Sequence, residues 1–296
     1  MTKLIPLVLL ALSACASSLD PATLIARDRV LGAKVTVDDD PQRAWPRPGE
    51  HATVTWLTAS PGASPEFSWI LAACPAATSS GFPICDGAVF ASSQSRGPVP
   101  VMSIAVPADI ATRSFVVLGA ICASGNAIID ATTFAASCDD GSLADRVSQH
   151  IFIARDGATN HHPNIIDAPF TFAGVAWNDR KEPGCGGLPE ISADSNDVLV
   201  GVAFEASARE MFAVVDEPAP WREELQLSVF ATAGELTQRY AYVEADDMRE
   251  VSPVAVEWTP PTAEEVPAEG LRVTFSFVVR DLRGGLDATT RALCVK

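Results

Sequence analysis

Apolar residues in this chain recur at every second position, in short segments separated by turn residues. In residues 29–37 the apolar positions include Val30, Ala33, Val35 and Val37, and polar residues stand between most of them. A period of two is typical of a strand that buries one face. Strand-like segments follow at residues 51–58, 67–74, 99–106, 114–122 and 150–154 of the first half, and at 170–177, 198–204, 224–232, 254–258, 271–280 and 292–295 of the second half.

Short strands separated by Pro, Gly and Asp turns, with few helical periods between them, predict an all-β protein. We expect two antiparallel immunoglobulin-like β-sandwiches in tandem, over residues 27–155 and 167–296. A chain of 296 residues is long enough for two domains that each bury a core.

Residues 156–166 separate the two halves, and their polar, turn-rich composition predicts a solvated interdomain linker. The linker contains adjacent histidines, His161 and His162. Successive side chains of an extended segment point apart, so the pair makes a poor metal chelate. We therefore interpret both histidines as linker residues.

The composition is that of a globular protein, with 48% hydrophobic and 20% charged residues. The formal net charge of −16 repels nucleic acid and anionic membrane surfaces, so no nucleic-acid partner is expected. We interpret the acidic excess as a contribution to solubility.

The N-terminus has the pattern of a secretory signal: Lys3, then an apolar run over residues 4–12, then small residues. The sequence Leu12-Ser13-Ala14-Cys15 resembles the lipobox of bacterial lipoproteins. That resemblance implies a signal peptide over residues 1–14, a lipidated Cys15 and a tether over residues 15–26. It also implies a cell-envelope lipoprotein held to the membrane by the lipid of Cys15. Ala16 after the cysteine resembles lipoproteins sorted to the outer membrane, on its periplasmic or surface face.

If Cys15 carries lipid, six cysteines remain, and an even number in an exported chain indicates disulfides. For the first half we favour two local pairs, although a core bridge from Cys74 to Cys122 is an alternative. The sequence contains no Cys-x-x-Cys pair, so a zinc site is not favoured over disulfides. The favoured pairs are Cys74–Cys85, Cys122–Cys138 and, in the second half, Cys185–Cys294.

Three segments carry a second resemblance. Residues 273–295, an alternating strand followed by Arg-Asp-Leu-Arg-Gly-Gly and a last strand, look like the terminal hairpin of PKD-like and related immunoglobulin-like domains of bacterial surface proteins. Residues 230–234, and the Pro-Gly-Glu turn at 48–50 before residues 54–56, are similar to segments of uncharacterised Gram-negative lipoproteins. The resemblance implies architecture and brings no catalytic residues with it.

The sequence lacks Gly-x-Ser-x-Gly, a P-loop, Gly-x-Gly-x-x-Gly and His-Glu-x-x-His, and we predict no cofactor. Acidic turns offer oxygen ligands of the kind that calcium takes, and Asp194 and Asp197 before a predicted strand are the first candidates. None of the acidic turns has EF-hand spacing, so we favour solvated turn residues over a metal site.

Our leading hypothesis is a non-enzymatic envelope lipoprotein that presents sandwich loops for protein or glycan binding, in an adhesive or structural role. The first alternative is an envelope hydrolase whose site lies between the two halves. The second alternative is a carrier of a small apolar ligand, which needs an enclosed apolar cavity of several hundred Å³ in order of magnitude.

Overall fold

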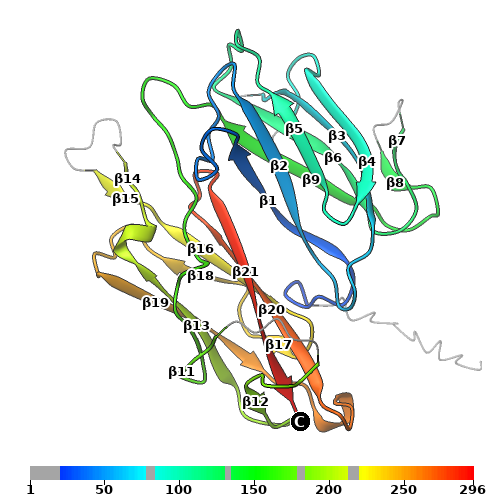
Figure 1. Ribbon diagram of the computed structural model, residues 1–296, viewed down its shortest axis with the longest axis vertical. Helices are drawn as coiled ribbons and strands as arrows, with labels where there is room; N and C mark the ends of the chain where they lie inside the picture. Colours follow the sequence, from blue (N-terminus) through cyan, green and yellow to red (C-terminus); the bar gives the residue numbers. More distant parts are fainter. Residues whose placement is uncertain (1–20, 78–83, 131–134, 179–183, 213–219) are drawn as a thin grey trace, which may run out of the picture.

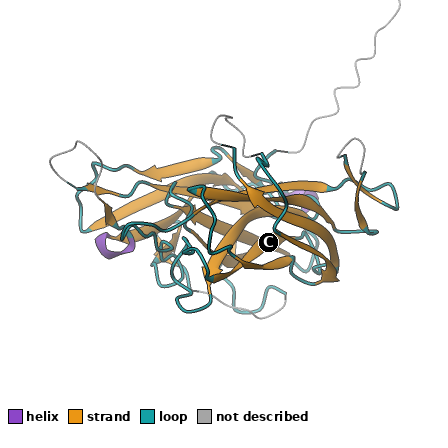
Figure 2. Cartoon of the chain, turned by 90° about the horizontal axis from the view of Figure 1, so that it is seen from above, coloured by secondary structure: helices purple, strands orange, loops and turns teal. Residues whose placement is uncertain are grey.

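A computed structural model describes residues 21–77, 84–130, 135–178, 184–212 and 220–296. Almost all regular structure in these residues is β-strand, and the strand pairs are antiparallel except for one short parallel pair (Figures 1 and 2). Two short 3-10 turns, η1 (Ala206–Ala208) and η2 (Ala263–Glu265), interrupt the strands. The predicted all-β class is confirmed. Cys15 and the predicted signal peptide lie outside the described residues.

The first sandwich packs a three-stranded sheet on a four-stranded sheet around a core that contains Trp56, Phe67, Trp69 and Phe115. The order of the smaller sheet is β1 (Arg29–Val37), β2 (His51–Ala59), β5 (Val101–Ala105). The order of the larger sheet is β4 (Ala91–Gly97), β3 (Phe67–Pro75), β6 (Ser114–Cys122), β9 (Asp145–Phe152). A separate hairpin joins β7 (Ala127–Ile129) to β8 (Ala136–Cys138).

The second sandwich packs two five-stranded sheets on each other. The order of one sheet is β11 (Val175–Ala176), β10 (Phe170–Phe172), β13 (Val198–Glu205), β19 (Val251–Thr259), β17 (Glu235–Leu236). The order of the other is β12 (Glu190–Ile191), β21 (Leu286–Val295), β20 (Leu271–Arg280), β16 (Leu225–Ala231), β18 (Tyr240–Val243). A small hairpin, β14 (Met211–Phe212) with β15 (Trp221–Arg222), extends from this sandwich.

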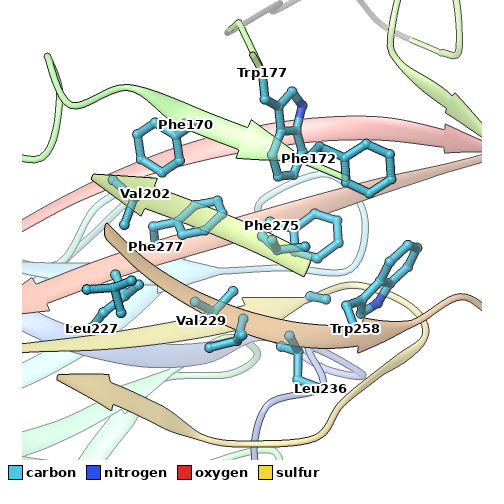
Figure 3. Packing of buried hydrophobic residues seen from close by; sticks show 14 of the residues in the cluster. Phe170, Phe172, Trp177, Val202, Leu227, Val229, Leu236, Trp258, Phe275 and Phe277 are labelled. Carbon is cyan, nitrogen blue, oxygen red and sulfur yellow. The ribbon is translucent and has the colours of Figure 1, made fainter. Parts of the chain in front are cut away.

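Alternation along the strands explains why these segments form a sandwich. In β19 every second residue is buried from Ser252 to Trp258, and the residues between them are exposed. The buried residues meet an aromatic cluster in which Phe275 lies 5.1 Å from Trp258 and 5.3 Å from Trp177, ring centre to ring centre (Figure 3). Both contacts are edge-to-face, and such pairs contribute about 0.5–1.5 kcal/mol beyond the burial of their surface.

Three disulfides connect strands and loops within the sandwiches, and they are the pairs that the cysteine spacing favoured. Each closes within one half of the chain, so no disulfide joins the two sandwiches in the described residues. The bonds are Cys74–Cys85, Cys122–Cys138 and Cys185–Cys294.

The predicted tether over residues 15–26 is partly wrong, because its last residues pack on the second sandwich. The Ile25 N–H donates to the Ala231 carbonyl at 2.8 Å, and the Ala231 N–H donates to the Thr23 carbonyl at 3.0 Å. β18 pairs with β16 only over Leu225 to Ser228, so the segment occupies the strand edge that β18 leaves open.

An apolar cluster lies where this docked segment meets both sandwiches. Ile25 is 1% exposed and packs with Leu31 of β1 and with Phe230, Val278 and Leu286 of the second sandwich. The docked segment therefore fills part of the apolar junction between the two sandwiches, and its burial removes apolar surface from water.

Replacing Ile25 by Ala is expected to destabilise the protein by about 2–4 kcal/mol, because the substitution leaves a cavity among side chains from three parts of the chain. The midpoint of urea unfolding measures the loss. Ile166→Ala is the matched control, because Ile166 is 60% exposed and its truncation should change stability by about 0.5 kcal/mol or less. Equal effects of the two substitutions would show that the docked segment does not stabilise the junction.

Candidate functional site

The junction has a second, polar side, which the turn between β20 and β21 organises. Both Arg283 N–H and Gly285 N–H donate to one carboxylate oxygen of Asp281, each at 2.8 Å. A Cβ at position 285 would lie 2.0 Å from the other Asp281 oxygen, so only glycine fits there. The turn is thus folded around a buried carboxylate, and it points the Arg283 side chain towards the first sandwich.

Arg283 connects four parts of the chain. Its guanidinium forms ion pairs with Glu223, which follows β15, and with Glu210 at 3.5 Å, and it donates to the Thr159 carbonyl of the linker at 2.9 Å. The guanidinium carbon lies 5.0 Å from the ring centre of Trp45 and 4.4 Å from that of Phe212. Each contact of this kind contributes about 0.5–2 kcal/mol, more where water is excluded.

Trp45 also donates a hydrogen bond to Arg283, from its indole N–H to the Arg283 carbonyl at 2.8 Å. Trp45 belongs to the loop between β1 and β2 of the first sandwich, whereas Arg283 belongs to the second. We call Trp45, His161, Glu210, Glu223 and Arg283 the junction cluster.

The carboxylates of the junction cluster differ in their surroundings. Glu223 is 1% exposed and also accepts a hydrogen bond from the Glu210 N–H at 3.0 Å. Burial raises the pKa of Glu223 to about 7; the negative charge of Asp281 adds to this rise, and Arg283 opposes it. Glu210 is more accessible and pairs with His161 Nδ1.

A buried polar layer lies beneath the junction cluster, and it corrects the prediction of a solvated linker over residues 156–166. Asn160 is fully buried and donates to Asp281 at 2.7 Å. His162 is 7% exposed and bonds both sandwiches: its Nε2 lies 2.5 Å from the Val35 carbonyl, and its Nδ1 accepts the Leu286 N–H at 3.0 Å. Asn160, His162, Pro163 and Ile165 of the linker are buried, whereas residues 156–158, Asn164 and Ile166 are exposed, so only part of the predicted linker is solvated. Backbone groups of both sandwiches bond the His162 ring.

The two bonds of His162 fix its chemical state. Since Nδ1 accepts a hydrogen bond from the Leu286 N–H, the ring is assigned as the neutral tautomer that carries its proton on Nε2. Burial lowers the pKa of His162 to about 4, and the nearby charge of Lys34 acts in the same direction. Lys34 itself crosses the junction to Asp287 at 2.9 Å.

An open cleft of about 740 Å³ lies beside the junction cluster. Apolar and polar groups share its walls, and the Thr159 hydroxyl has no hydrogen-bond partner within the described part of the chain. Such a mixed, concave surface between domains is typical of ligand sites. The cleft is lined by Trp45, Asp156, Gly157, Ala158, Thr159, Glu210, Met211, Phe212 and Arg283.

The structure does not bring the sequence-predicted calcium candidates together as a metal site. Asp194 accepts the Ala263 N–H at 3.3 Å, and Asp197 accepts the Thr259 hydroxyl at 2.6 Å, so both serve as turn acceptors. Among the residues described, no group of three or more His, Cys, Asp or Glu side chains could hold a metal.

Glu223, Arg283 and Trp45 are far apart in the chain, and no sequence pattern predicts that they meet. A usable signal was present only for Arg283, in the Asp-Leu-Arg-Gly-Gly turn. That turn shows where the chain reverses but not what the arginine reaches.

Comparisons with known proteins add little. No protein-family model and no curated protein matches this chain. Two solved structures align with 92% of it at 9% identity and a TM-score of 0.25: Salmonella α2-macroglobulin reacted with methylamine, and the native conformation of E. coli α2-macroglobulin. The chain spans 16% and 17% of those two proteins, and the likeness carries no argument about function. No helix of the described residues is long and apolar enough to cross a membrane.

Two titrating groups of the junction, His162 and Glu223, are expected to act in opposite directions on stability. His162 has a pKa below its ordinary 6.5, so its contribution is present above pH 6.5 and is lost as the pH falls towards 4. Glu223 has a pKa above its ordinary 4.5, so its contribution is present below pH 4.5 and is lost as the pH rises towards 7.

The two effects oppose each other between pH 4.5 and 6.5, and Asp281, whose pKa burial also raises, acts in the same direction as Glu223. Glu223→Gln removes one of them, so this variant should lose stability on acidification more steeply than wild type, by up to about 1.4 kcal/mol per pH unit. Urea unfolding at several pH values measures both slopes. If the unfolding free energies of wild type and variant changed with pH at the same rate, the titration of Glu223 would be contradicted, even if one protein were more stable than the other at every pH.

Proposed function

We propose that this protein is a membrane-anchored lipoprotein of the bacterial cell envelope that binds a protein or glycan partner without catalysing a reaction. The lipid of Cys15 holds it to the membrane, and the junction cleft between the two sandwiches is its binding surface. The lipobox-like sequence supports the anchor, and the cleft supports the binding role.

One observation carries the non-enzymatic part of the proposal: the ionisable groups of the junction cluster are paired with each other. Arg283 is held by Glu223 and Glu210, and His161 is held by Glu210. A general acid or base must reach the proton of a substrate. Glu223, the group with the most perturbed pKa, is buried behind Arg283 and has no such access.

The envelope hydrolase is the second candidate, and one observation favours it. Two carboxylates, Glu210 and Glu223, approach the same arginine, and they have different exposure. Carboxylates in unlike environments are the pattern of acid and base pairs in glycoside hydrolysis. The filled cores of the two sandwiches give the apolar-carrier hypothesis no comparable support.

Replacing Cys15 by Ala should move the protein from the membrane fraction to the soluble fraction, because no acyl chain would then hold it in the bilayer. Fractionation followed by immunoblotting measures the distribution. Ser17→Ala is the control, since it changes the same region without removing the thiol. A Cys15→Ala protein that stays in the membrane fraction would refute the lipid anchor.

A bulky side chain in the cleft should abolish binding of the partner while leaving the fold intact. Ala158 is exposed and lines the cleft, so Ala158→Trp fills it, and Ala111→Trp is the matched control at an exposed alanine of the first sandwich. Capture of partners from the native envelope compares both variants with wild type. Release of new reducing ends from envelope glycans by wild type but not by Glu223→Gln would instead establish the hydrolase.

A further inference from the structure

The docked segment at residues 21–25 has a consequence for how the anchored protein lies on its membrane. Five residues separate Cys15 from Pro21, so even fully extended chain spans only about 20 Å between them. Without docking, free chain would run to Asp28 and reach about 45 Å. The bonds of Thr23 and Ile25 to Ala231 therefore keep this edge of the junction near the site of lipidation.

Basic side chains gather at the same edge. We call Arg27, Arg29 and Arg239 the anchor-side patch. Arg29 donates to the carbonyls of Ala22 and Leu24, at 2.9 and 3.2 Å, so it is bound to the docked segment itself.

The three arginines are close enough to affect each other. Burial lowers the pKa of Arg29, and the positive charges of Arg27 and Arg239 lower it further. Two carboxylates face the patch: Asp145, 3.6 Å from Arg27, and the half-buried Asp28. A fourth arginine, Arg280, lies deeper and donates to the Leu31 carbonyl.

The positive balance of this patch is notable because the whole chain carries a formal charge of −16. A bilayer surface with anionic lipids repels most of such a protein and attracts only a local basic region. Guanidinium groups also bind phosphate oxygens in a fixed, bidentate geometry. The short tether and the local positive charge are independent observations, and both indicate that the same edge of the molecule faces the membrane.

We propose that the anchor-side patch is the membrane-facing surface of this protein, with its arginines in contact with the headgroup phosphates of the bilayer that holds the lipid of Cys15. This inference rests on the proposed lipid anchor. It adds an orientation to that anchor, because a lipid on a long free tether leaves the attached body free to tumble.

The orientation also places the cleft. In Figure 1 the blue segment that leads into β1 and the β14–β15 hairpin lie on opposite sides of the junction. Met211 and Phe212 of that hairpin line the cleft. With the anchor-side patch on the membrane, the cleft opens away from the bilayer, where a partner can reach it.

The test uses the full lipidated chain in vesicles of phosphatidylethanolamine and phosphatidylglycerol that carry a headgroup-linked quencher. A fluorescent amino acid replaces either Leu143, whose neighbours include Arg27, or Ala111 at the other end of the first sandwich. The pairing of β6 with β9 separates the two sites by about 25 Å along the strands. We expect severalfold stronger quenching at position 143 than at position 111.

Charge reversal provides the decisive comparison. Arg27→Glu with Arg239→Glu should bring the quenching ratio of the two positions close to one, as should the milder Arg27→Gln with Arg239→Gln if the reversed protein folds poorly. Arg47→Glu with Arg113→Glu, at the far end of the first sandwich, should leave the ratio unchanged. Equal quenching in wild type, or a ratio that survives both patch variants, would overturn the orientation. Wild-type protein that fails to float with the vesicles would overturn the lipid anchor itself, and with it this proposal.

Discussion

The ion pair between Arg283 and Glu223 lies where the first sandwich, the linker, the β14–β15 hairpin and the β20–β21 turn meet. A charge removed from water must be compensated, and removing one partner of a buried pair costs about 3–5 kcal/mol. Glu223 has little access to solvent, so its charge depends on Arg283 staying in place. Since Trp45 of the first sandwich contacts Arg283, this pair fixes one of the side chains through which the two sandwiches meet.

The polar and apolar sides of the junction constrain each other. On the polar side, His162 bonds Val35 of the first sandwich and Leu286 of the second. On the apolar side, Ile25 packs between Leu31 and Val278. Hydrogen bonds set the register of the two bodies, because an unpaired buried polar group is costly. Apolar burial stabilises the contact between the two sandwiches but is non-directional, so it does not fix their register.

Strand prediction worked where one face of a strand is buried in a core. The residues of β1, β6 and β20 match the predicted bounds, since alternation or apolar content marks them clearly. β4 was missed because Ala91–Gly97 is polar and mostly exposed, so its pairing with β3 leaves no hydrophobic pattern. Residues 170–177 form a hairpin rather than one strand, because Ala173 and Gly174 both adopt positive φ.

The sequence by itself determined the all-β class, because the alternation of strand residues and the turn residues between them are local patterns of neighbouring residues. It also favoured the three disulfides that the structure contains. Only the tertiary structure decided that Asn160 and His162 of the linker are buried, that residues 21–25 dock on β16, and that Trp45, Glu223 and Arg283 meet. Those contacts join residues up to 238 positions apart, and their energy depends on burial that no local pattern encodes.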